Sequence, residues 1–362
     1  MIDRDRLVAT FLELVRIDSV SGEEQAAGDW AQRRLESLGA TVTRDAIGNV
    51  LGRLPGRGKS LLLNAHLDTV VPGRGVQPVV EGDIIRSDGR TILGGDDKAG
   101  VAVVLETVQA LQDAGVPLPA LEILFTAQEE VGLCGAKAVD TATLRAREGI
   151  GLDAGGPIGT IVVQAPAQDS LDVTIVGRAA HAGGEPEKGI SAIRVAAEAI
   201  AQMPHGRIDP ETTANIGIIA GGQATNIVCE RVHVRGEARS RSADKLVAQT
   251  SAMVAAFEQA AARHGARAEI GVQRAYDAFS IASDEPILRL LGEAAAAVGV
   301  KAVHVPTGGG SDANVFNAAG LRVVNISCGM DKVHTTEECI AISDMVQAAE
   351  WLTAALRLRA GA

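Results

Sequence analysis

Two histidines and several carboxylates in this sequence have the types and the placement that a metal centre needs. His66 and Asp68 are two residues apart at the end of the apolar run 61–70, so the alternation of a strand points both side chains to one face. Asp96 lies in LGGDDKAG, before a helical pattern, where the helix N-terminus also favours a carboxylate. The other candidates each follow an apolar, strand-like run, and they are Glu129, Glu130, Asp153 and His334.

Imidazole and carboxylate ligands without a thiolate suit zinc, cobalt or manganese, and two metals roughly 3.5–4 Å apart need a carboxylate that bridges them. Each candidate also has a simpler interpretation. An isolated His-x-Asp is usually a hydrogen-bonded pair, and Asp96-Asp97 before a helix would be an N-cap. The shared placement at strand ends favours the metal centre, because ligand sites in open α/β sheets form outside the carboxyl ends of the strands.

The elements that position these residues alternate between strand and helix patterns. The runs 61–70 and 121–130 are typical of buried strands, and residues 98–115 place Val101, Val104 and Leu105 on one helical stripe. This βαβ order predicts a mixed, mostly parallel sheet flanked by helices, an α/β fold.

The pattern changes in the middle of the chain. Residues 167–278 give the order β-α-β-β-α-β of a small inserted lid or dimerisation domain. Strand and helix alternate again after residue 279, with a Gly-rich loop at 307–314 and a final helix at 342–359. We therefore expect residues 1–166 and 279–362 to form a catalytic domain.

Composition excludes several classes of partner. The net charge of −11 argues against nucleic acid and anionic membranes, which need basic patches. No stretch approaches the 18 or more apolar residues of a membrane span. The four cysteines are far apart without a C-x-x-C pair, which indicates neither disulfides nor a thiolate site and favours a reducing cytoplasm.

Eight motifs give the sequence a family resemblance. They run in the order NAHLDTV, GGDDKAG, AQEEVG, GLDAGG, GRAAHAG, TNIVCE, GGGSDA and VHTTEE over nearly the whole chain. The sequence resembles the co-catalytic metallopeptidase family of peptidase T, carboxypeptidase G, aminoacylase and succinyl-diaminopimelate desuccinylase. It is most similar to the peptidase T-like branch, through GGDDKAGVA and the PEKGISAI segment at 186–193.

The resemblance implies a ligand set for two divalent metal ions. His66 and Asp153 would bind one metal, Glu130 and His334 the other, and Asp96 would bridge them. Zinc is the first expectation, with cobalt and manganese as alternatives.

The resemblance also implies catalytic roles for three further residues. Asp68 would orient His66 as its carboxylate partner, and Glu129 would be the general base. His181 resembles the family histidine that reaches the reacting carbonyl, commonly across a dimer interface.

Four positions match places where the family holds its substrate, namely Asn226, Arg239, Gly309 and Ser311. Arg239 and Arg241 are two residues apart, so a strand points both to the same face and either can bind a substrate carboxylate.

The most favoured function is an aminopeptidase that acts on dipeptides or tripeptides. A carboxypeptidase or an N-acyl amino acid amidohydrolase with the same metal centre is the alternative. A non-catalytic binding module is a third hypothesis, which the intact Glu129 beside a full ligand set argues against. The resemblance implies a homodimer formed through the inserted domain.

Overall fold

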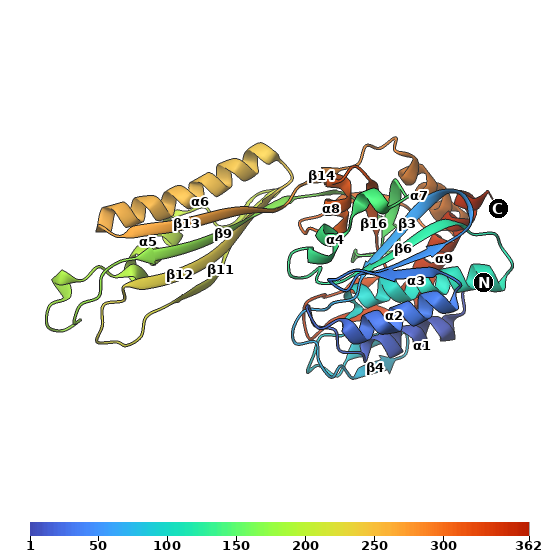
Figure 1. Ribbon diagram of the computed structural model, residues 1–362, viewed down its shortest axis with the longest axis horizontal. Helices are drawn as coiled ribbons and strands as arrows, with labels where there is room; N and C mark the ends of the chain where they lie inside the picture. The colour runs from blue at the N-terminus through green and yellow to red at the C-terminus, as the bar shows by residue number, and fades with distance from the viewer. Residues whose placement is uncertain (362) are drawn as a thin grey trace. The chain divides into compact units, whose positions relative to one another are not determined.

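The structure is a computed structural model that describes residues 1–361, and it divides into two compact units (Figure 1). The first unit contains residues 1–163, 280–306 and the chain from 311 onward. The second unit contains residues 164–279 and 307–310.

A mixed sheet forms the centre of the first unit, in the order β1-β2-β6-β3-β7-β16-β8-β14 with β15 beside β8. The neighbours β6, β3, β7 and β16 are parallel, and antiparallel pairs flank them. The strands are β1 (Thr41–Arg44), β2 (Val50–Leu54), β3 (Arg57–His66), β6 (Pro119–Thr126), β7 (Glu148–Gly151), β8 (Thr160–Ala165), β14 (Phe279–Ser280), β15 (Val303–Pro306) and β16 (Arg322–Ile326). Because the four central strands are parallel, their carboxyl ends meet at one edge.

Helices cover this sheet. They are α1 (Arg4–Val15), α2 (Gln25–Ser37), α3 (Gly95–Asp113), α4 (Cys134–Ala138), α7 (Pro286–Ala297), α8 (Asp312–Ala318) and α9 (Ile342–Ala360), with a 3-10 turn η1 (Thr141–Thr143). α3 and α9 contact each other and β3, and α1 contacts both helices. The predicted fold class, a mostly parallel sheet flanked by helices, is confirmed. Among residues 1–361, no helix has the length and apolar character to cross a membrane.

A small sheet in the order β17-β18-β5-β4 supports the loops near α3. Its strands are β4 (Pro78–Glu81), β5 (Ile84–Ser87), β17 (Met330–Asp331) and β18 (Cys339–Ala341). β18 pairs with β5, so a segment near residue 340 is tied to the chain just before α3.

The second unit is a five-stranded antiparallel sheet in the order β10-β11-β12-β9-β13, with both helices along one face (Figure 1). Its elements are β9 (Ala167–Val176), η2 (Pro186–Lys188), α5 (Ala192–Gln202), β10 (Gly206–Asp209), β11 (Thr212–Gly221), β12 (Arg231–Ser240), α6 (Ala243–His264) and β13 (Arg267–Tyr276). Leu171, Val173 and Ile175 of β9 alternate with exposed or half-buried residues and pack beneath the helices. The sequence predicts four strands here and misses β10, which is too short for an alternating pattern.

Residues 307–310 belong to the second unit, although the sequence places them in the first domain. Three contacts explain the difference. The Thr307 amide donates to the Gln164 carbonyl at 2.8 Å, and Arg241 donates to the Thr307 carbonyl at 3.2 Å. Gly310 passes so close to the Tyr276 ring that a Cβ atom there would overlap it.

Candidate metal centre and active site

The carboxyl ends of the parallel strands bring the five candidate ligands together in the first unit. His66 is the last residue of β3, and Glu130 and Asp153 follow the ends of β6 and β7. Asp96 lies in the first turn of α3, where its backbone angles are not helical and its peptide bond to Asp97 is cis. His334 lies in the loop between β17 and β18.

These residues form overlapping groups whose ligand atoms lie within 4.8 Å of one another. One group is His66, Asp96 and Asp153, and another is Asp96, Glu130 and His334. The two Asp96 oxygens face different imidazoles, since Oδ1 is 3.1 Å from His66 Nε2 and Oδ2 is 3.2 Å from His334 Nε2. Asp96 therefore belongs to both groups, and it faces each imidazole with a different carboxylate oxygen.

The cluster extends from the interior to the surface. His66 is buried, whereas the His334 side chain is 49% exposed and lies 2.9 Å from Glu130 Oε1. Hydrogen bonds to Asp96 and Glu130 raise the pKa of His334 to about 10. Burial, with the negative charge of Asp96, raises the pKa of Asp153 to about 8. Protons and divalent cations compete for these atoms.

Asp68 acts mainly on the backbone of the neighbouring loop. Its Oδ1 accepts the Glu129 amide at 2.8 Å, and its Oδ2 accepts the Glu130 amide at 3.2 Å and the Ser21 hydroxyl at 2.6 Å. His66 Nδ1 lies 2.9 Å from the Asp68 carbonyl oxygen but 3.6 Å from the carboxylate. The main-chain oxygen is thus the closer partner of His66, and the Asp68 carboxylate also faces the ring, so its predicted role in orienting His66 stays a prediction.

Glu129 is buried beside these ligands. It forms a group with His66 and Glu130 whose atoms lie within 4.8 Å of one another. Burial raises its pKa well above the ordinary value, and the negative charge of Asp153 adds to the effect. The preceding residue, Gln128, has a left-handed φ of 54°, and its amide donates to Glu24 at 3.1 Å. Strain of this kind persists where surrounding contacts fix the backbone.

Sequence reasoning missed several buried polar residues that support this site. Asp97 accepts the His66 amide at 3.3 Å, and Asp312 accepts a hydrogen bond from Thr126. Glu338 accepts the backbone amide of Asp96 and those of Leu93 and Gly94 just before it. Glu338 lies within the VHTTEE motif and Asp97 within GGDDKAG, so the motifs contained the signal, but only the fold shows what these side chains contact.

The second unit holds His181 and Asn226 in adjacent exposed loops. The Ala182 amide donates to the Asn226 carbonyl at 2.9 Å, which joins the loops. His181 Nδ1 accepts the amides of Gly183 and Gly184 at 3.1 and 2.9 Å. A neutral imidazole that accepts at Nδ1 carries its proton on Nε2, so that nitrogen is a hydrogen-bond donor.

The two arginine candidates have different partners. Arg239 makes two bonds to the Glu237 carboxylate, at 2.8 and 3.0 Å. Arg241 instead donates to the carbonyls of Thr307 and Pro210, at 3.2 Å each, so it holds the chain at the start of the Gly-rich loop. The alternation of the strand could not distinguish these two roles.

The Gly-rich loop divides between the two units. The Gly309 amide donates to Thr307 Oγ1 at 3.2 Å in the second unit. Ser311 is buried in the first unit, where it caps α8 and accepts from Asn325 at 3.0 Å. Ser311 thus has a structural task in addition to the substrate contact that its motif suggests.

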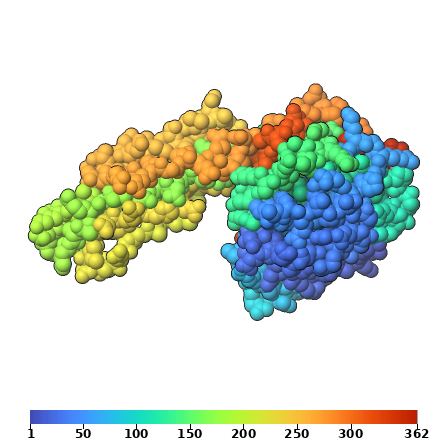
Figure 2. Space-filling model, viewed as in Figure 1, coloured from blue at the N-terminus to red at the C-terminus, as the bar shows by residue number. Residues whose placement is uncertain are grey.

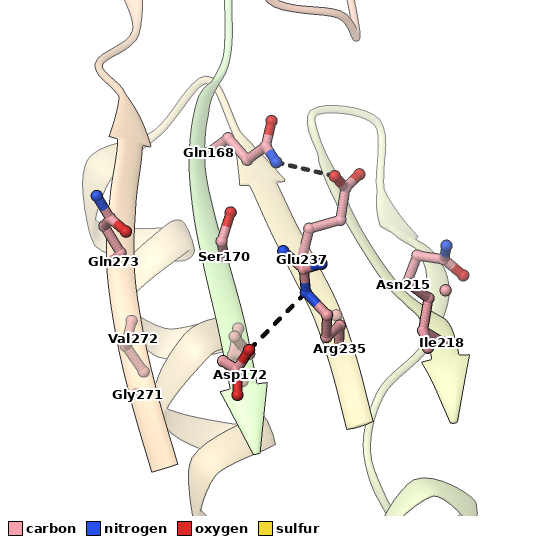
Figure 3. Close-up of a pocket in the computed structure, with 13 residues that line it drawn as sticks. Gln168, Ser170, Asp172, Asn215, Ile218, Arg235, Glu237, Gly271, Val272 and Gln273 are labelled. Carbon is pink, nitrogen blue, oxygen red and sulfur yellow. Dashed lines mark hydrogen bonds and ion pairs between the residues drawn. The ribbon is translucent and has the colours of Figure 1, made fainter. Parts of the chain in front are cut away.

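The open face of the second unit's sheet carries a polar hollow of about 580 Å³ (Figure 3). Figure 3 shows Glu237 bonded to Gln168 and Arg235 paired with Asp172 across it. None of the residues predicted for the site lines it. The charged residues that line it already have partners, because Asp172 pairs with Arg235 and Glu237 with Arg239.

Comparisons with known proteins agree with these features. The sequence model of a peptidase dimerisation domain matches residues 168–265, and that of peptidase family M28 matches residues 49–189. Peptidase T of Geobacillus thermodenitrificans is 26% identical, with 98% of each chain covered.

Two solved structures are more similar. Aminopeptidase PepT from Bacillus cereus is 40% identical, with 99% of each chain covered and a TM-score of 0.88. A tripeptidase from Staphylococcus aureus is 37% identical, with complete coverage of both chains and a TM-score of 0.93. The fold, the motifs and these likenesses have one reading: the chain is a peptidase that belongs to the M20 family of co-catalytic metallopeptidases, in its peptidase T-like branch.

Proposed function

We propose that this protein is an aminopeptidase that removes the N-terminal residue from dipeptides and tripeptides with the help of two divalent metal ions. The observation that carries the proposal is the Asp96 carboxylate, whose two oxygens face His66 and His334 at 3.1 and 3.2 Å. The names of the similar structures, an aminopeptidase and a tripeptidase, favour short peptides with a free amino end.

The residues present fit such a pair of ions. His66 and Asp153 would hold one metal, Glu130 and His334 the other, and Asp96 both, all with nitrogen and oxygen ligands that suit zinc and also cobalt or manganese. When bound, a pair of this kind activates water as a nucleophile and polarises the substrate carbonyl.

Glu129 is the proposed general base. Its carboxylate takes a proton from the attacking water and later gives it to the leaving amine. The Asp68 carboxylate accepts the Glu129 amide at 2.8 Å, and this hydrogen bond fixes the backbone from which the Glu129 side chain extends. Glu129 must be ionised to accept a proton, and the positive charge of bound metal ions would favour this form against the burial that raises its pKa.

His181 is the proposed oxyanion donor. Its Nδ1 accepts two backbone amides, which leaves Nε2–H to donate to the carbonyl oxygen as negative charge develops. Asn226, Arg239 and the Gly309–Ser311 segment complete the substrate contacts in this proposal.

The peptidase dimerisation domain suggests a homodimer, and we place its interface at β11. Within residues 1–361, β10 covers only Thr212–Ala214 of the outer edge of β11, and no further strand pairs with it. Ile218 and Ile219 are 49% and 52% exposed there, and in Figure 2 the yellow atoms of this part of the chain lie at the surface of the second unit. An open apolar edge is a template for pairing with another strand. A monomer in light scattering at assay concentration would contradict this interface.

All four cysteines are free, and we therefore place the protein in the reducing cytoplasm.

The test of function is digestion of a defined tripeptide by protein whose metal content is measured on the same sample. We expect release of the N-terminal residue and about two metals per chain. Release of the C-terminal residue would favour a carboxypeptidase, and hydrolysis of N-acyl amino acids alone would favour an amidohydrolase. A metal-loaded protein that is inactive on a wide peptide panel would favour the binding module.

A further inference from the structure

Glu338 is a buried carboxylate to which the proposed mechanism gives no task. It follows His334 by four residues and is 1% exposed. Its backbone is fixed on both sides, because its amide donates to the Thr335 carbonyl at 3.2 Å and β18 begins at the next residue. The backbone of Glu338 is therefore rigid, and it belongs to the same loop as His334.

The Glu338 carboxylate accepts three backbone N–H groups from the loop that leads into α3. Oε2 accepts the amides of Leu93 and Gly94 at 2.8 Å each, and Oε1 accepts the Asp96 amide at 3.0 Å. Gly94 has a φ of 77°, and a Cβ atom on Gly95 would lie 3.1 Å from Oε1. The loop thus encloses the carboxylate closely, and successive N–H groups that converge in this way form a site for an anion.

This contact joins two loops that are far apart in sequence and adjacent in the metal centre. One loop supplies Asp96 and the other supplies His334, whose Nε2 lies 3.2 Å from Asp96 Oδ2. We propose that Glu338 is a positioning residue that holds Asp96 in place to bridge the two metal ions. This inference rests on the proposed metal centre, which it deepens by naming the group that sets its central ligand.

A merely structural role makes a different prediction. If Glu338 only stabilised the loop, its loss would lower the free energy of unfolding but leave the metal ligands of the folded protein unchanged. Partners that orient a ligand typically change metal affinity by about 10–100-fold when they are mutated. Metal affinity and the spectrum of the bound ion therefore separate the two roles.

The test compares Glu338→Gln with Glu337→Gln. The first variant keeps the side-chain size but loses the charge and turns one acceptor into an amide donor that would face backbone N–H groups. The control changes the adjacent residue, whose side chain is 75% exposed and pairs with Lys332 at 3.1 Å. Metal-free full-length protein is titrated with Zn²⁺ and with Co²⁺ against a competing chelator. The absorption and magnetic coupling of the Co²⁺ forms are then recorded.

We expect Glu338→Gln to bind the ions about 10–100-fold more weakly and to change the Co²⁺ spectrum and coupling, and Glu337→Gln to match the wild type. Wild-type affinity and spectrum in Glu338→Gln would overturn the inference and leave the proposed function intact. A wild-type protein that binds no metal would overturn the proposed function itself. If Glu338→Gln does not fold, Glu338→Asp decides, since it keeps the charge but shortens the reach. A changed Co²⁺ spectrum in that variant supports the inference, and an unchanged spectrum and affinity overturn it.

Discussion

The metal-ligand cluster of the first unit and the His181 loop of the second unit hold their reactive groups in different ways. In the first unit, buried carboxylates fix both the side chains and the backbone around them. Asp68 binds the amides of Glu129 and Glu130, and Glu338 binds that of Asp96. In the second unit, His181 is exposed and two backbone amides set its tautomer.

This difference separates two requirements of the proposed chemistry. The carboxylates of the first unit repel one another unless cations or protons neutralise them. Hydrogen bonds must therefore hold these side chains close together in the first unit. A single donor that meets a substrate needs only the right tautomer. Changes to the ligands, to Glu129 or to Glu338 in the first unit should therefore affect metal binding or proton transfer, whereas changes at His181 should affect the rate alone.

The largest effect is expected for Glu129→Gln. The amide cannot take the proton from water, so kcat should fall by roughly 10²–10⁴-fold while the metal content stays at the wild-type level. Steady-state hydrolysis and elemental analysis of one preparation measure both quantities. Glu13→Gln on the exposed face of α1 is the control. Unchanged turnover in Glu129→Gln would remove Glu129 from the mechanism.

His181→Ala should lower kcat by about 10²-fold, the typical cost of losing an oxyanion donor. Metal content and melting temperature should not change, because the side chain is exposed and outside the ligand cluster. The matched control is His233→Ala, which removes a surface imidazole paired with Asp172 in the same unit. Loss of metal from the His181 variant would contradict the proposed separation of the two regions.

Metal affinity should rise with pH, by at least about 100-fold between pH 6 and 8, because each proton that must leave changes the affinity about tenfold per pH unit. The pKa of His334 is about 10, that of Asp153 about 8, and hydrogen bonds to Asp68 and Asp96 raise the pKa of His66 well above its ordinary value despite its burial. Near neutral pH all three groups therefore carry protons that must leave before they can bind a cation. Lower pH therefore favours the metal-free protein. Calorimetric titration in buffers of different ionisation heat should show about three protons released per chain. Binding without proton release would show that the ligands lie elsewhere.

The smallest effect is expected for Ser21→Ala, which removes the 2.6 Å hydrogen bond to Asp68. Asp68 keeps both backbone amides, so the variant should lose about 1–2 kcal/mol of stability and change kcat less than about threefold. Thermal unfolding and kinetics measure the two effects. A loss of metal as large as that expected for Glu338→Gln would mean that Ser21, too, positions the ligands.

Much of the fold followed from local patterns. The apolar runs at 61–70 and 121–130 indicated buried strands, which the structure shows as β3 and β6. The final helix, expected at 342–359, is α9 at Ile342–Ala360. The short strand β10 and the attachment of residues 307–310 to the second unit were not predictable, because both depend on contacts with distant residues.

The sequence alone determined which residue types could bind metal and that they follow the strands of one sheet. Strand alternation and hydrophobic periodicity are local properties, so they can be read from the chain. Only the tertiary structure decided that Asp96 faces both imidazoles, that Asp68 accepts the Glu129 amide, and that Glu338 supports the loop of Asp96. The physical reason is that a buried carboxylate must find donors wherever the fold provides them. For Glu338 these donors lie more than 240 residues away in the sequence.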